Sequence, residues 1–221
     1  MSQHIFSNFD EELNEFRDSV ISIGTHTVDA LSRAREAFML ADRDALSDIV
    51  EDDELIDMLE MRIDEKGMAI LMRFKPFAYD LRLVVSSVNI SRSFERMADH
   101  AVTIAKRSRK AFKKGQSQAV KTLEPLFLEA QQIAEAALRS YADRDEALAQ
   151  QVLLMDEKAD ELYKSISKNL MKRLPQADVE AEQLLHLAFI AKSLERIGDL
   201  AVNVAEDVIF ILSAEDVRHQ S

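Results

Sequence analysis

Apolar residues recur every three or four positions along nearly the whole chain, which is the spacing of one buried helix face. Phe16, Val20 and Ile23 show it early, and Leu31 and Phe38 continue it at helical spacing. Polar breaks and helix-ending residues divide the pattern into segments. It predicts six long helices, at about 8–41, 45–74, 76–114, 120–142, 145–174 and 178–212.

The scarcity of glycine and proline strengthens this prediction. Only four glycines and three prolines occur in 221 residues, too few for the turns of a β-sandwich or barrel. We expect Pro76 in the first turn of the third helix and Gly115 as the C-cap that ends it. Short connections between long helices indicate antiparallel neighbours. The expected fold is therefore all-α, with two tandem three-helix bundles at 1–115 and 116–221, joined at 116–119.

The net charge and the composition exclude several classes of function. The net charge is −12 and 47% of residues are hydrophobic, which is too apolar for a disordered acidic segment. An acidic chain argues against nucleic acid as a partner, because phosphate binding needs concentrated lysine and arginine. Cysteine is absent, so thiolate sites and disulfides are excluded. No apolar signal core or membrane-spanning run is present in the sequence, so we expect a cytosolic protein.

The two halves carry a repeated motif. The segments 93–99 and 193–199, which lie 100 residues apart, both read S-[FL]-E-R-x-x-D. Upstream, 58–65 matches 154–161 at an offset of 96 residues. Each half therefore has an acidic residue, three others and an aspartate on each of two consecutive helices. We interpret the halves as copies of one unit, related by an internal pseudo-symmetry.

These acidic pairs are candidate metal ligands. Carboxylates at i and i+4 lie on one helix face and repel each other unless something neutralises them. Antiparallel packing would bring the pairs of neighbouring helices together in one groove, where carboxylates suit a hard multivalent cation. The candidates are Glu60, Asp64, Glu95 and Asp99 in the first half, and Asp156, Asp160, Glu195 and Asp199 in the second.

Other interpretations of the charged residues and of the methionines stay open. The acidic faces are also compatible with simple solvation, with Arg96 and Arg196 as surface ion-pair partners. A ferritin-like oxidase is disfavoured, because its Glu-x-x-His motif is missing. The basic run at 106–114 suits either a helix C-terminus or an acidic partner. We expect the methionines of the second and third helices to fill the core; these are Met58, Met61, Met68, Met72 and Met97.

The motif pair resembles the repeat signature of PhoU proteins. The resemblance rests on the segments 93–99 and 193–199, on 49–53, 63–65 and 76–83, and extends over about 6–217. It implies two three-helix bundles with multinuclear metal clusters on their surface. The ligands that it implies are Glu60, Asp64, Glu95 and Asp99, then Asp156, Asp160, Glu195 and Asp199. Two departures stand out: Ala98 is found where the second copy has Gly198, and Asp156 replaces a glutamate.

The resemblance also implies a function. PhoU-like proteins are cytosolic negative regulators of the phosphate-starvation response that couple the ATPase subunit of a phosphate ABC transporter to a membrane sensor histidine kinase. We therefore expect a non-enzymatic, metal-binding adaptor that forms a homodimer and reaches the membrane through its partners. The cation would be iron, zinc, manganese or magnesium. Two rivals remain: a metal-dependent enzyme such as a carboxylate-bridged phosphatase, and a purely structural helical adaptor.

Overall fold

The protein is a set of long helices. The computed structural model describes residues 2–51, 53–115, 118–176 and 180–218, and these ranges contain no strand. The all-α prediction is confirmed. The α-helices are α1 (Ser2–Leu40), α2 (Ala45–Glu51), α3 (Asp53–Phe74), α4 (Tyr79–Ala111), α5 (Glu124–Asp143), α6 (Glu146–Arg173) and α7 (Ala181–Ser213), and the 3₁₀ turns are η1 (Phe112–Lys114), η2 (Gln118–Leu123) and η3 (Leu174–Gln176).

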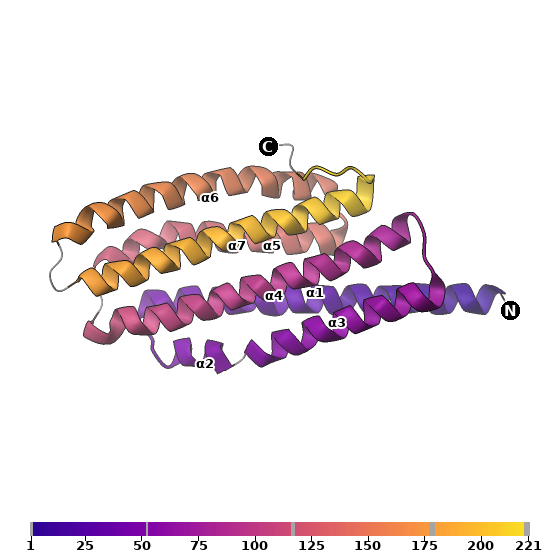
Figure 1. The fold of residues 1–221 in the computed structure, drawn as a ribbon, viewed down its shortest axis with the longest axis horizontal. Coiled ribbons are helices and arrows are strands. Elements are labelled where there is room, and N and C mark those ends of the chain that lie inside the picture. The colour runs from indigo at the N-terminus through magenta and orange to yellow at the C-terminus, as the bar shows by residue number, and fades with distance from the viewer. Residues whose placement is uncertain (1, 52, 116–117, 177–179, 219–221) are drawn as a thin grey trace.

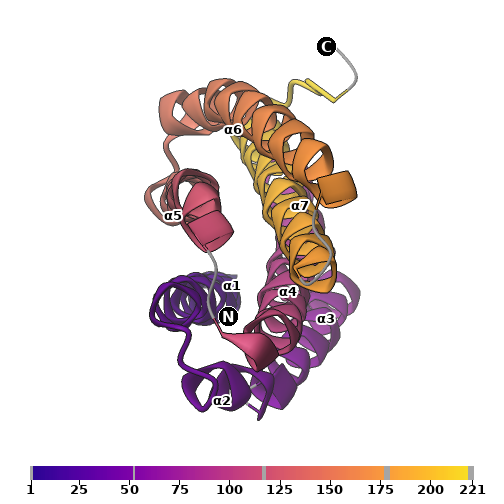
Figure 2. The same ribbon diagram turned by 90° about the vertical axis from the view of Figure 1, so that its left-hand side faces the viewer.

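The helices form two layers along one long axis (Figure 1). Viewed along the helices, α6, α7, α4 and α3 follow one another in one layer, and α5 and α1 lie beside them in the second layer, on the left (Figure 2). The central helices α4 and α7 pack most extensively on each other, and α1 packs on α5. The units α1–α4 and α5–α7 are therefore two helical bundles that share a long seam.

One apolar core runs through both units. Phe38 of α1 is fully buried, and its ring centroid lies 4.8 Å from that of Phe127 on α5 and 5.4 Å from that of Phe112 in η1. Further along, the Ser87 hydroxyl of α4 lies 2.6 Å from the Tyr141 hydroxyl of α5, in a buried hydrogen bond. These contacts join residues from both halves of the sequence.

The pseudo-symmetry extends to the ends of the seam. The Arg82 guanidinium in the first turn of α4 donates to the carbonyl oxygens of Phe210 and Ile211 at the end of α7, both at 3.0 Å. In return, the Gln183 amide of α7 donates to the carbonyl oxygen of Ala111, at 2.8 Å. Ala111 and Ile211 are 100 residues apart, so each central helix donates side-chain hydrogen bonds to carbonyl oxygens near the C-terminus of the other. The reciprocal contacts fix α4 and α7 as antiparallel.

The helix boundaries differ from expectation in two places. The helix expected over 45–74 is two helices, because α2 ends at Glu51 and packs against α1 and α4. Pro76 lies in the loop before α4 instead of in its first turn, since Lys75 and Ala78 both have positive φ and reverse the chain there. Gly115 ends η1 with φ 96°, a conformation that suits glycine. Residues 116 and 117 of the expected linker at 116–119 lie outside the described residues, and residues 118 and 119 belong to η2.

The prediction for the methionines is wrong for four of the five. Met97 is fully buried in α4, as expected. The other four lie on α3 and are exposed, because α3 is an edge helix whose buried face is formed by Ile56, Ile63 and Ile70 instead. The four are Met58, Met61, Met68 and Met72.

Candidate metal centre

The eight predicted ligands lie on the four helices of one layer. Glu60 and Asp64 belong to α3, Glu95 and Asp99 to α4, and the four second-half residues to α6 and α7. On each helix they stand beside the buried apolar face, so most of them are partly covered. Asp99 is the exposed member. The sequence pattern explains why the candidate ligands lie there, because acidic residues at i and i+4 border the apolar stripe that packs on the neighbouring helix.

In the first half, an arginine of α4 bridges the acidic pair of α3. Nη2 of Arg92 donates to Oδ2 of Asp64 at 2.7 Å, and its Nε lies 3.6 Å from Oε1 of Glu60. Burial and the neighbouring Asp64 raise the pKa of Glu60, and Arg92 opposes them. Glu95 follows Arg92 by about one turn of α4 and is half-buried. The acidic row of α3 is therefore neutralised from the neighbouring helix.

In the second half, four carboxylates come together. Burial, together with the charges of Asp199, Asp160 and Glu195, raises the pKa of Asp156 to about 6. Within the described residues, Asp156 forms no ion pair with a lysine or arginine. Burial and the charge of Glu195 also raise the pKa of Asp199. Here the packing of α6 on α7 brings these acidic side chains close enough for their charges to act on one another.

The glycine of the second motif makes room for this cluster. A Cβ added at Gly198 would lie 2.5 Å from Oδ1 of Asp156, closer than real Cβ contacts come. The first half has Ala98 in the matching place, and the longer Glu60 opposite it. The two departures noted in the sequence are thus coupled in the second half, where the shorter aspartate occupies space that an alanine methyl would fill.

The cations of the second cluster sit at its rim. Nζ of Lys192 lies 2.6 Å from Oε1 of Glu195, and Nη1 of Arg196 lies 3.3 Å from Oδ2 of Asp199. Lys164 pairs with Asp160 along α6 at 2.9 Å. Among the described residues, Oε2 of Glu195 is buried and accepts no hydrogen bond, and the cation beside it is Arg196, whose Nε lies 3.9 Å away. A buried carboxylate oxygen without a donor is costly, so it is a position where a cation would be stabilising.

The donor set is chemically suited to a hard cation, because every candidate ligand supplies carboxylate oxygens. Oδ1 of Asp64 resembles Oε2 of Glu195 in being buried without a donor, within the part of the chain described. No group of three or more His, Cys, Asp or Glu in that part is already arranged around one metal position. Binding would therefore require side-chain rotation, and in the first half Arg92 would have to move away.

Two cationic residues contact the candidate carboxylates although the repeated motif does not include them. Arg92 bridges the α3 pair, whereas the sequence suggested Arg96; the matching second-half residue, Lys192, contacts Glu195 instead. The signal was present, since Arg92 and Lys192 each stand three residues before the motif glutamate. Which cation reaches which carboxylate depends on helix packing, so spacing alone did not decide it.

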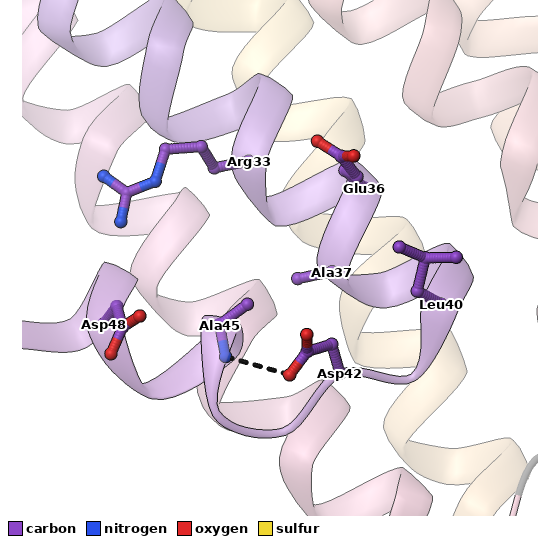
Figure 3. Close-up of a pocket in the computed structure, with 7 residues that line it drawn as sticks. All are labelled: Arg33, Glu36, Ala37, Leu40, Asp42, Ala45 and Asp48. Atoms are coloured by element: carbon purple, nitrogen blue, oxygen red, sulfur yellow. Dashed lines mark hydrogen bonds between the residues drawn. The ribbon is translucent and has the colours of Figure 1, made fainter.

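A separate pocket of about 240 Å³ lies at the corner between α1 and α2 (Figure 3). Asp42 lines it and accepts hydrogen bonds from the backbone N–H groups of Asp44 and Ala45, both at 3.1 Å, so this side chain caps the start of α2. None of the eight candidate ligands lines this pocket. Across the described residues, no helix is long and apolar enough to cross a membrane.

Known proteins share both the repeat and the fold. The PhoU domain matches this chain twice, over residues 20–108 and 123–208. A crystal structure of PhoU from Pseudomonas aeruginosa superposes with a TM-score of 0.91 at 29% identity, covering 94% of this chain and all of that one. The crystal structure of PhoU from Streptococcus pneumoniae gives a TM-score of 0.87 at 23% identity over 95% of this chain and 99% of that one.

Sequence relatives extend over the same length. A "phosphate-specific transport system accessory protein PhoU homolog" of Xylella fastidiosa is 33% identical over 98% of this chain and 90% of its own length. The Escherichia coli protein with the corresponding name, "phosphate-specific transport system accessory protein PhoU", is 29% identical over 99% of this chain and 91% of its own length. The repeated motif, the fold and the relatives agree, and this chain belongs to the PhoU family.

Proposed function

We propose that this protein is a non-enzymatic regulator of phosphate uptake and of the response to phosphate starvation. It would act in the cytoplasm as a metal-binding adaptor between the ATPase subunit of a phosphate ABC transporter and a sensor histidine kinase. The names of its full-length relatives, accessory proteins of the phosphate-specific transport system, support the regulatory role. The metal-binding part rests on Asp156, which feels the charges of Asp160, Glu195 and Asp199 and is paired with no lysine or arginine in the described part of the chain.

The residues have distinct roles in this proposal. Asp156, Asp160, Glu195 and Asp199 would hold the second cluster, and Glu60, Asp64, Glu95 and Asp99 the first. A bound multivalent cation would supply positive charge that relieves the repulsion among these carboxylates. Because the ligands come from neighbouring helices, their neutralisation would hold α3 against α4 and α6 against α7. Partners would recognise the surface that this helix packing presents.

The metal-binding part is tested by replacing one ligand in each half. The Glu95→Ala/Glu195→Ala variant should remain helical but bind iron, manganese, zinc or magnesium on the order of 10–100-fold more weakly or worse, since even supporting residues of metal sites have effects of this size. Elemental analysis after metal loading and gel filtration measures occupancy, and circular dichroism checks the fold. Wild-type protein with only trace metal after loading, or unchanged binding by the variant, would contradict the ligand assignment.

The role of Gly198 gives a second test. In a Glu95→Ala background, which isolates the second cluster, Gly198→Ala should weaken metal binding about tenfold or more by displacing the Asp156 carboxylate. The free energy of unfolding should change by about 1 kcal/mol or less without metal, because alanine favours the helix and a flexible side chain can yield. Titration calorimetry measures the first quantity and urea unfolding the second.

The matched control is Ala98→Gly in a Glu195→Ala background. It removes a methyl at the equivalent position of the first half and should leave metal binding there within about twofold, because no carboxylate competes with that methyl for space. Equal losses in the two backgrounds would mean that the effect comes from the helix and not from room for Asp156.

Adaptor function is tested with the partners themselves. Chelator-treated protein should bind the transporter ATPase subunit and the cytoplasmic part of the sensor kinase more weakly than metal-loaded protein. Surface plasmon resonance with each purified partner measures this. Full binding after metal stripping would instead favour a purely structural adaptor, and metal-dependent hydrolysis of a phosphate ester that Glu60→Ala abolishes would indicate an enzyme.

A further inference from the structure

One side of α3 exposes a row of methionines that the core does not use. Met58, Met61, Met68 and Met72 are between 44% and 67% exposed, and their spacing of 3, 7 and 4 residues places them on one side of the helix. We call these four residues the methionine face. Leu55, also exposed, lies one turn before it. Long apolar side chains gathered on one exposed face are characteristic of interaction surfaces.

The second half shows that the fold does not require this face. Residues 96 positions later occupy the equivalent places on α6, where they are Leu154, Glu157, Lys164 and Lys168. Three of these four are charged, and Leu154 alone is apolar. A duplicated helix with the same neighbours is therefore stable with a polar outer side. The methionines reflect something specific to α3.

The charges around the methionine face indicate what would cover it. Six acidic residues but only two cations, Arg62 and Lys66, occur from residue 53 to residue 72, and Lys66 pairs with Glu15 of α1 at 3.1 Å. Glu54, Asp57 and Glu65 are exposed beside or between the methionines. An apolar row with acidic neighbours is complementary to a helix with one apolar side and basic edges.

We propose that the methionine face docks a basic amphipathic helix of a partner protein. The face spans 14 residues, or roughly 21 Å of helix, which a partner helix of about 15–18 residues would cover. Methionine is unbranched and polarizable, so its side chains can adapt to the apolar side of such a helix. Glu54, Asp57 and Glu65 would pair with the flanking lysines or arginines. This surface shares no residue with the proposed ligands and does not depend on the metal proposal.

The test uses a defined probe, a fluorescein-labelled 18-residue peptide of leucine and lysine with its leucines on one helix side. Fluorescence anisotropy measures its binding to the full chain in a chelating buffer, so the result is independent of metal loading. A peptide of the same composition, with the leucines scattered around the helix, controls for attraction to a chain of net charge −12. The amphipathic peptide should bind about tenfold or more tightly than the scattered one.

Variants locate the binding surface. Met61→Gln/Met68→Gln keeps charge and side-chain length and should weaken binding of the amphipathic peptide about tenfold or more. The matched control on α6 is Leu154→Gln, which should change it less than about twofold. Glu54→Gln/Asp57→Asn/Glu65→Gln should weaken binding and reduce its salt dependence, because screening then has fewer charge pairs to act on. All these positions are exposed, so circular dichroism should show an unchanged fold.

Four results would overturn the proposal. Equal binding of both peptides, or full binding by Met61→Gln/Met68→Gln, would remove the apolar contact on which it rests. Self-association in sedimentation equilibrium that this methionine variant abolishes would show a second copy of the chain as the occupant. Binding to phosphatidylglycerol vesicles that the same variant abolishes would show a membrane surface instead.

Discussion

Phe38→Ala should lower the free energy of unfolding by about 3–5 kcal/mol, the range found for large aromatic residues removed from cores. Phe38 is fully buried, and it contacts the rings of Phe112 and Phe127 where α1 meets η1 and α5. Truncation leaves a cavity between the two halves of the chain, and the surrounding helices can collapse into it only in part. Urea unfolding followed by circular dichroism measures the loss.

An exposed phenylalanine provides the control for Phe38. Phe77→Ala, in the loop before α4, should change the free energy of unfolding by less than about 0.5 kcal/mol, because that side chain is 82% exposed. Since the cavity lies between the halves, we expect one unfolding transition that shifts as a whole. A loss below about 1 kcal/mol for Phe38→Ala, or two transitions of which one stays in place, would contradict a shared core.

Asp207→Asn should raise stability at neutral pH and remove part of its pH dependence. Asp207 of α7 is buried at the seam with α4, and burial raises its pKa to about 6 although Ser86 and Asn89 donate hydrogen bonds to it. The folded state therefore binds a proton more tightly than the unfolded state, whose aspartates titrate near 4. Stability contributed by this group is greatest below about pH 4 and declines as pH rises toward about 6.

Above pH 7, Asp207→Asn should raise the free energy of unfolding by about 2–3 kcal/mol, because one pKa unit corresponds to about 1.4 kcal/mol. Any hydrogen bonding that the amide loses relative to the carboxylate reduces this gain. Urea unfolding between pH 4.5 and 7.5 in a chelating buffer measures the slope. Asp143→Asn, at an exposed position ending α5, should leave that slope unchanged. A variant with the wild-type slope would show that Asp207 is not the group responsible.

Much of the fold could be predicted because helices are local. Residues such as Phe16, Val20 and Ile23 repeat at helical spacing, and all three are buried as expected. Asp145 is a second local signal, because it begins the fifth expected helix at 145–174 and its carboxylate caps α6 by accepting a hydrogen bond from the N–H of Leu148 at 3.0 Å. Such signals need only neighbours within one or two turns.

The errors occurred where one helix meets another. The methionines of α3 have helical spacing, so the pattern alone could not tell a core-facing side from an exposed one. Burial of Ile56, Ile63 and Ile70 decides which side faces α1 and α4. Pro76 was misplaced for a related reason, since the positive φ of Lys75 and Ala78 reflects how the chain turns between α3 and α4.

The candidate site likewise has some features that can be predicted from local sequence and others that depend on helix packing. The eight carboxylates, their pairing on each helix and their duplication can be read from residue type and helical period. Helix packing, in contrast, places Arg92 between Glu60 and Asp64, and places Asp156 against Gly198 among other acids. Charges act through space, so their partners follow from how α3 meets α4 and α6 meets α7, and not from spacing along the chain.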